Sequence, residues 1–138
     1  MKKIALITGA TSGIGKACAR KFAQGGYDVI ITGRRAQLLA DLKKELEAIG
    51  VRVLALAFDV CNRKAATAAI KSLPLEWQQI DVLINNAGLA LGLEPEYEGS
   101  FEDWDMMIDT NIKGLLTMTR LVVPRMVARD SEIGRAHV

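Results

Sequence analysis

The sequence predicts an α/β fold, with a doubly wound parallel sheet that is covered by helices on both faces. Apolar runs of strand length alternate with helical patterns of ten or more residues, which is typical of parallel strands joined by crossover helices. A glycine-rich turn directly follows the first apolar run and opens a helix, which fits the same architecture. Half of the 138 residues are hydrophobic, so we expect one domain with a buried core.

Two strand–helix units occupy the first part of the chain. We expect strands at residues 3–8, 28–32 and 52–57, and helices at residues 13–24 and 36–49. Gly25 and Gly26 end the first helix, and Gly50 serves as the C-terminal cap of the second. Each helix therefore has a stop signal of its own.

The second part of the chain continues the alternation. Asn62 caps a helix over residues 63–73, and residues 82–84 form a short, wholly apolar strand. Ser100 begins S-F-E-D, a variant of the capping box, ahead of a long helix that reaches residue 127. Right-handed crossovers then give the Rossmann-like strand order 3-2-1-4, with the ligand crevice at the carboxyl ends of strands one and four.

Composition and charge exclude several classes of function. The formal net charge of +2 is too small for a nucleic-acid surface, and the basic residues are scattered among acidic ones. The first apolar stretch is too short for a signal peptide or a membrane span. We therefore expect a cytoplasmic protein with a small-molecule ligand. Cys18 and Cys61 stand in no paired motif, so we expect two reduced, buried thiols and no metal site.

A glycine-rich motif lies between the first strand and the first helix, where residues 8–15 read T-G-A-T-S-G-I-G. Gly9 permits a sharp exit from the strand, Gly13 lets the backbone approach a pyrophosphate, and Gly15 lets the helix pack closely. The helix N-terminus offers unpaired N–H groups to the phosphates, and Ser12 can add a hydroxyl donor. The alternative is a plain glycine-rich turn, but the position between strand and helix favours a dinucleotide.

The end of the second strand carries basic residues instead of an acid. A site that selects the unphosphorylated dinucleotide needs an acid there to accept from the ribose 2′-OH, but residues 32–35 read T-G-R-R. The guanidinium of Arg34 can bind a 2′-phosphate bidentately, and Gly33 leaves room for it. Arg35 either assists or begins the next helix. The alternative for the pair is a solvated helix start, although positive charge is unfavourable at a helix N-terminus.

Two further turns follow the third and fourth strands. Asp59 and Val60 are placed to close over an adenine ring, with the carboxylate accepting from its amino group; Asp59 is equally well suited to a local cap. Residues 85–88 read N-N-A-G, in which the amides can brace neighbouring strands and the ligand while Gly88 admits the ligand to the backbone. In isolation this string is an ordinary turn. Its position at the ligand crevice, after the fourth strand, favours a binding site for the dinucleotide.

Taken together, these motifs resemble the short-chain dehydrogenase/reductase family. The resemblance rests on T-G-x-x-x-G-I-G at residues 8–15, N-N-A-G at residues 85–88 and Asn111, and it covers residues 3–129. It implies an oxidoreductase that binds NADP(H) rather than NAD(H), because Arg34 stands where such members carry a basic residue. The predicted cofactor-binding residues are Thr8, Gly9, Ser12, Gly13, Ile14, Gly15, Arg34, Arg35, Asp59, Val60, Asn85, Asn86, Ala87 and Gly88.

Asn111 is the catalytic residue that the resemblance assigns. It lies in D-T-N-I-K-G on the long helix, where the family's Asn holds a water that links the catalytic lysine to solvent. Since Asn is a mediocre helix former, a local reason for it is expected; the alternative is a solvent-facing polar position. Residues 89–95 and 102–104 are similar to the subgroup that oxidises 3-hydroxy acids such as serine or allo-threonine.

The family's remaining catalytic groups are missing from the sequence. The family uses a Ser, a Tyr and a Lys four residues after the Tyr, in elements that follow the Asn111 helix. Neither Tyr27 nor Tyr97 has a Lys at that spacing, and His137 has no partner residue nearby. We therefore expect a fold truncated after about four strands and the long helix, with a foreign or frame-shifted tail at residues 130–138.

Truncation would leave part of the long helix without a packing partner. We expect its exposed apolar residues to be Leu115, Leu116, Met118, Leu121 and Val122. The family pairs this helix with that of another subunit, which implies a homo-oligomer, and the isolated chain should fold marginally or aggregate. Two functions stay open: the cofactor-binding half of an oxidoreductase acting on a small hydroxy or keto substrate, and a non-catalytic dinucleotide-binding or interaction module.

Overall fold

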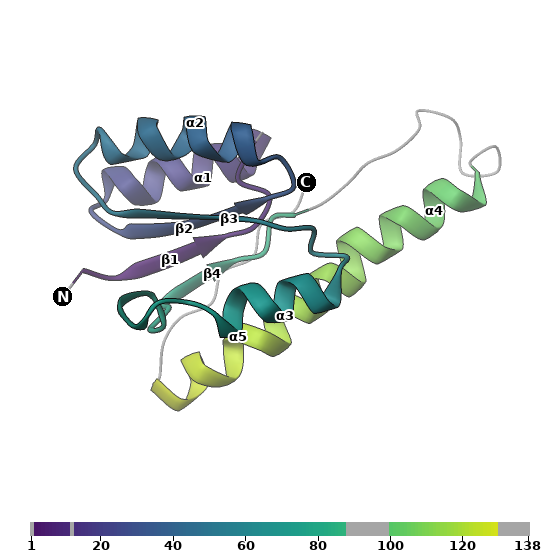
Figure 1. The fold of residues 1–138 in the computed structure, drawn as a ribbon. Helices are drawn as coiled ribbons and strands as arrows, with labels where there is room; N and C mark the ends of the chain where they lie inside the picture. The colour runs from purple at the N-terminus through teal and green to yellow at the C-terminus, as the bar shows by residue number, and fades with distance from the viewer. Residues whose placement is uncertain (1, 12, 88–99, 130–138) are drawn as a thin grey trace.

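The computed structural model describes residues 2–11, 13–87 and 100–129. Its centre is a parallel sheet in the order β3-β2-β1-β4, as predicted. The strands are β1 (Ile4–Ile7), β2 (Asp28–Gly33), β3 (Val53–Ala57) and β4 (Val82–Ile84). Helices α1 (Gly13–Gln24) and α2 (Ala36–Glu47) cover one face, and α3 (Arg63–Lys71) and α5 (Leu115–Arg129) cover the other (Figure 1). The predicted α/β class is therefore confirmed.

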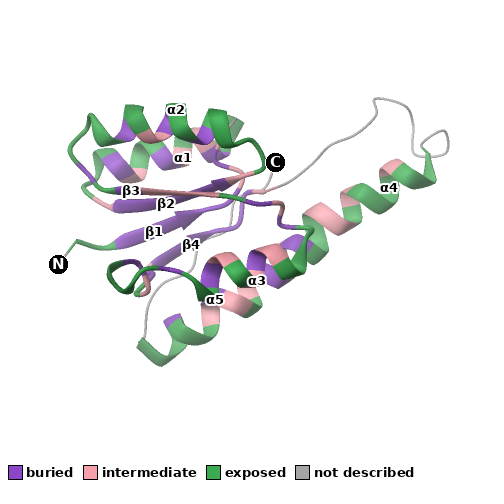
Figure 2. Cartoon of the chain, viewed as in Figure 1, coloured by how far each residue is buried: buried purple, intermediate pink, exposed green. Residues whose placement is uncertain are grey.

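Burial on both faces of the sheet explains why the strands read as unbroken apolar runs. Along β1, Ala5 and Ile7 pack into the core beneath α1 and α2, whereas Ile4 and Leu6 pack into the core beneath α3 and α5. Figure 2 shows the buried strands between helices whose outer faces are exposed. The carboxyl ends of β1, β2 and β4 are thereby held at one rigid edge.

The predicted helix signals are used, although the ends of elements shift by a residue or two. Asn62 accepts a hydrogen bond from Ala65 N at 3.0 Å, and Ser100 accepts one from Asp103 N at 3.1 Å. Gly50 follows α2 with a φ of +110°. The helices α2 and α3 end two residues earlier than predicted. A short 3-10 helix, η1 (Leu75–Trp77), was not predicted; it buries Trp77 in the core.

The predicted long helix is helical throughout but is not one regular α-helix. It consists of α4 (Phe101–Ile108), a π-helical turn η3 (Asp109–Gly114) and α5. At Gly114 the helix packs so tightly on Val60 that a Cβ would lie 2.7 Å from a Val60 methyl group. Widened turns of this kind are frequent at functional sites. The helix α4, which precedes η3 in the chain, buries no residue, and Figure 1 shows it projecting from the body of the molecule.

The expected exposure of the long helix is partly wrong. Met118 and Val122 are buried in the core with α3, because α5 turns this face toward the sheet. Leu115 and Leu121 are half-buried, and only Leu116 of the predicted set is exposed. Exposed apolar side chains lie mainly further toward the N-terminus of the helical segment, at Phe101, Trp104, Met106, Ile108 and Ile112.

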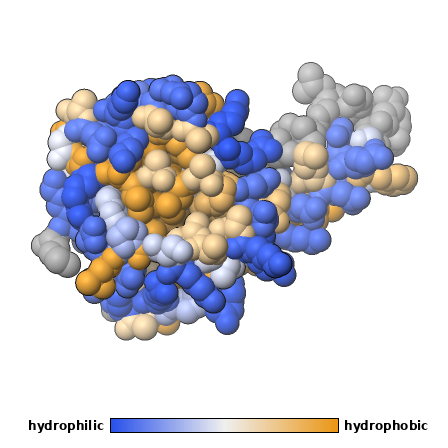
Figure 3. Space-filling model, viewed as in Figure 1, coloured by the Kyte–Doolittle hydropathy of each residue, from blue (hydrophilic) through white to orange (hydrophobic). Residues whose placement is uncertain are grey.

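The surface mixes polar helix faces with apolar patches. Figure 3 shows hydrophobic side chains on the body between the two polar helix layers. On the edge strand β3, Leu54 and Leu56 are only half-buried. Within the described part of the chain, the search for a helix of membrane-spanning length and hydropathy found none.

Candidate cofactor-binding site

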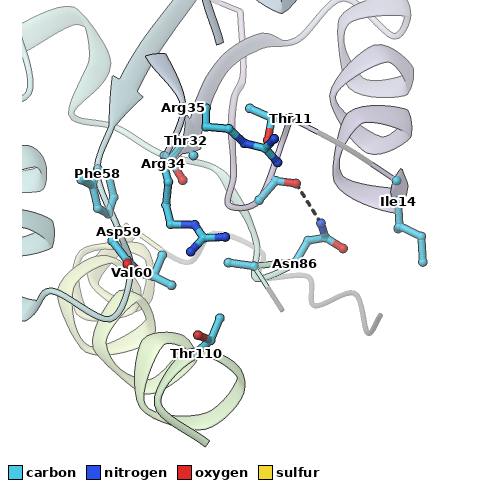
Figure 4. A pocket seen from close by; sticks show the side chains of 14 residues that line it. Thr11, Ile14, Thr32, Arg34, Arg35, Phe58, Asp59, Val60, Asn86 and Thr110 are labelled. Carbon is cyan, nitrogen blue, oxygen red and sulfur yellow. Dashed lines mark hydrogen bonds between the residues drawn. The ribbon is translucent and has the colours of Figure 1, made fainter. Parts of the chain in front are cut away.

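A pocket lies at the carboxyl edge of the sheet, where four strand ends meet (Figure 4). The predicted residues that line it are Gly9, Gly13, Ile14, Arg34, Arg35, Asp59, Val60, Asn86 and Ala87. Gly33, which was predicted to leave room for a ligand, lines it as well, and so do Thr11, Thr32, Phe58 and Thr110, for which the sequence indicated no role. Among the predicted residues, Ser12 and Gly88 lie outside the described part of the chain, as do the loop at residues 89–95 and the tail at residues 130–138.

The turn after β1 and the turn after β4 are in direct contact. Gly9 has a φ of +61°, and a Cβ on it would lie 2.8 Å from Ala87 Cα. A Cβ on Gly15 would overlap both the Gly9 carbonyl oxygen and the Asn86 side-chain nitrogen. These glycines therefore allow α1 to begin right against the joined strand ends. By contrast, the Cβ position of Gly13 faces open space, as a ligand approach to the backbone requires.

Thr8 and Asn86 connect these two turns by hydrogen bonds. Thr8 Oγ1 accepts from Asn86 N at 3.0 Å and from Ala87 N at 2.9 Å. Asn86 Nδ2 donates to the Gly9 carbonyl at 3.1 Å, the bond drawn in Figure 4. Thr8 is buried and is not part of the pocket lining. Its side chain therefore braces the two turns.

Asn85 connects β4 to the helix layer. Its Nδ2 donates to Thr119 Oγ1 at 3.1 Å, and that hydroxyl donates to the Leu115 carbonyl at 2.8 Å. Asn85 does not line the pocket. The first Asn of N-N-A-G thus positions α5, whereas the second faces the ligand side.

Two arginine side chains that directly follow β2 bring positive charge to the pocket. Arg34 and Arg35 are exposed, and Figure 4 shows both side chains reaching into the pocket. Neither forms an ion pair with another described residue. Arg35 also occupies the N-cap position of α2, where its side chain makes no capping hydrogen bond. Two guanidinium groups without an acidic partner suit a phosphate.

Asp59 lines the pocket, whereas Cys61, two residues further on, does not. Asp59 Oδ1 accepts from Cys61 N at 2.9 Å, which is the local turn role, while the residue also lines the pocket. Cys61 is exposed, in contrast to the expectation of a buried thiol, because the turn carries it outward. Its sulfur lies 3.1 Å from Thr110 Oγ1, and partial shielding from solvent together with nearby Asp59 raises the pKa of the thiol.

Asn111 lies on η3, next to the pocket residue Thr110. It is exposed and does not line the pocket itself. The sequence placed Asn111 on a regular helix and gave no signal for Thr110. Thr110 lies in the widened turn and lines the pocket, and hydrophobic periodicity does not reveal such a turn.

The site contains buried polar atoms that still lack hydrogen-bond partners. Among the described residues these are Thr32 Oγ1, Asn85 Oδ1 and Asn86 Oδ1, and both Thr32 and Asn86 line the pocket. Buried polar groups in folded proteins are nearly always paired, so a ligand is the natural partner here. Together with the two arginines and the open backbone at Gly13, these atoms fit a phosphorylated dinucleotide.

Comparisons with known proteins agree with this arrangement. A family model described as short chain dehydrogenase matches residues 3–135. The NADP-dependent 3-hydroxy acid dehydrogenase YdfG of Salmonella typhi is 53% identical over 135 residues, which are 98% of this chain and 52% of that protein. The chain thus spans about half the length of the relatives it matches.

Solved structures of dehydrogenases also resemble this chain. Serine dehydrogenase from Escherichia coli has 51% sequence identity and a TM-score of 0.89, covering 96% of this chain and 60% of that one. A structure titled the closed form of serine dehydrogenase complexed with NADP+ matches with the same identity and TM-score, covering 96% of this chain and 52% of that one. The strand order, the glycine-lined turns and these matches together show that the chain belongs to the short-chain dehydrogenase family.

Proposed function

We propose that the chain is the NADP(H)-binding part of an oxidoreductase that transfers hydride between NADP(H) and a small hydroxy or keto substrate. The observation that carries this proposal is the pair Arg34 and Arg35, which reach into the pocket without an acidic partner among the described residues. An acid at the end of β2 would favour the unphosphorylated ribose, and none stands there. The NADP-dependent relatives and the NADP+ complex support the same cofactor.

Each pocket wall has a distinct part in binding. The N-terminus of α1 and the turn at Gly13 present backbone N–H groups to the pyrophosphate. Arg34 binds the 2′-phosphate, and Asp59 with Val60 borders the adenine. Asn86 keeps the turn after β4 fixed while its Oδ1 faces the ligand side. When bound, the nicotinamide supplies the hydride or accepts it.

The substrate we propose is a small 3-hydroxy acid such as serine. This rests on the names of the relatives, a 3-hydroxy acid dehydrogenase and a serine dehydrogenase. Asn111 is proposed as the residue that holds a water for proton relay in the whole enzyme. The 138 residues contain no Tyr with a Lys four residues later, so we propose that this polypeptide by itself binds the cofactor without turning it over.

A titration and an absorbance assay test these proposals together. Fluorescence titration of the 138-residue chain with NADPH should give saturable binding. A panel of 3-hydroxy acids with NADP+ should produce no NADPH absorbance with this chain. Absence of NADPH binding would contradict the cofactor proposal, whereas turnover would refute the proposal that the chain acts as a binding module only.

We also propose that the chain self-associates through the helical segment α4–η3–α5. Ile108, Ile112 and Leu116 are spaced four residues apart and are each about half exposed, so they form one apolar stripe. Sedimentation of the unmodified chain should show dimers or larger species, and the double variant Ile108→Glu/Leu116→Glu should shift the chain toward monomer. Arg120→Glu, an exposed change on α5, is the control. A monomeric, sharply melting unmodified chain would refute this proposal.

A further inference from the structure

Thr32 carries a buried hydroxyl that the protein does not use. The residue lies in β2, pairs with Leu56 of β3 and is 1% exposed. Its Oγ1 has no hydrogen-bond partner among the described residues, and the residue lines the cofactor pocket. An unpaired buried hydroxyl destabilises a fold, so we expect this hydroxyl to form a hydrogen bond with a group outside the protein.

Thr8 provides an internal comparison at the end of the neighbouring strand. It is also 1% exposed, but its Oγ1 accepts from Asn86 N and Ala87 N and lies 3.4 Å from the Ile84 carbonyl. Two threonine side chains with the same burial therefore differ: the Thr8 hydroxyl is hydrogen-bonded within the protein, and the Thr32 hydroxyl is not. The difference points to a partner that arrives from the pocket.

Thr32 shares the pocket with Arg34, the residue proposed to bind the 2′-phosphate. Thr32 lies in β2, Arg34 comes directly after the last strand residue, Gly33, and both residues line the pocket. Figure 4 shows the Thr32 hydroxyl and the Arg34 guanidinium in the same pocket, between the Asp59 and Asn86 walls. A ligand held by Arg34 would therefore lie in the same pocket as the Thr32 hydroxyl.

We propose that the Thr32 hydroxyl is a binding group for the adenosine end of the phosphorylated dinucleotide. This inference rests on the proposed function. A hydroxyl both donates and accepts, so it can pair with a ribose oxygen or with an adenine nitrogen. Because Oγ1 is covered by neighbouring atoms, the ligand must move a side chain to reach it. Arg34 is exposed and has no ion pair among the described residues, so it can move.

The first test compares melting temperatures without ligand. Thr32→Val removes an unpaired hydroxyl and keeps the shape, so we expect the melting temperature to rise by roughly 2–5 °C. Thr8→Val leaves two backbone N–H groups without their acceptor, so we expect a fall of at least about 5 °C. A fall for Thr32→Val like that for Thr8→Val would show that the hydroxyl is engaged within the protein and would overturn the proposal.

The second test measures binding of 2′,5′-ADP and 5′-AMP, which are the adenosine ends of the two dinucleotides. Thr32→Val should weaken both by about threefold to tenfold, the value of one hydrogen bond. Thr32→Ser, which keeps the hydroxyl, should bind within about twofold of the unmodified chain. Unchanged binding by Thr32→Val would overturn the inference alone. If the unmodified chain bound neither nucleotide, both the inference and the proposed function would be contradicted.

Discussion

Replacing Gly15 with alanine is expected to lower the melting temperature by about 10 °C and to abolish NADPH binding. In an ordinary helix position alanine is better than glycine by about 1 kcal/mol. Here, however, the new Cβ would overlap the Gly9 carbonyl oxygen and the Asn86 side-chain nitrogen. Forcing these apart should cost about 3 kcal/mol, and the hydrogen bond that joins the two turns would break.

Thermal unfolding followed by circular dichroism, together with NADPH titration, measures this effect. Gly25→Ala is the matched control, since a Cβ there would meet its nearest neighbour at an ordinary 3.4 Å. That variant should melt within about 2 °C of the unmodified chain and bind NADPH normally. A Gly15→Ala chain as stable as the control would show that α1 does not press against the joined turns.

Replacing Arg34 with glutamate is expected to weaken NADPH binding by about a hundredfold while changing NADH binding by less than about threefold. The substitution removes charge-assisted hydrogen bonds to the 2′-phosphate and places a carboxylate beside it. The glutamate can instead accept from the 2′-OH of NADH. An equal loss of affinity for NADPH and NADH would mean that Arg34 supports the pocket as a whole and does not bind the 2′-phosphate specifically.

Lys71→Glu serves as the control for net charge. Lys71 is exposed and ends α3, which begins at the pocket edge of the sheet and runs away from it. The charge change is the same as in Arg34→Glu, but long-range attraction at this distance is screened by salt. NADPH affinity should therefore stay within about twofold of the unmodified value.

The sequence was sufficient to predict the sheet order and most of the pocket. These features depend on local signals: strand-length apolar runs, the glycines at residues 9 and 15, and the basic residues directly after β2. Because the carboxyl ends of parallel strands meet at one edge, residues far apart along the chain could be placed together. Arg34 and Val60 line one pocket for this reason.

Features that depend on packing between distant segments could not be predicted. The turn η3 widens where Gly114 meets Val60, and this contact leaves no trace in periodicity. The sequence predicts Met118 and Val122 at the surface because a truncated fold lacks later packing partners, but α3 and the sheet cover both residues. Thr32 reads as an ordinary β-branched strand residue until its unpaired hydroxyl is seen.

Recognition of a 2′-phosphate by the pocket beside β2 should make the chain prefer NADPH over NADH. Calorimetric titration of the unmodified 138-residue chain with NADPH and with NADH, in one buffer at fixed salt, tests it most directly. The two guanidinium groups at Arg34 and Arg35 predict that NADPH binds at least about tenfold more tightly. Equal affinities, or tighter binding of NADH, would contradict it.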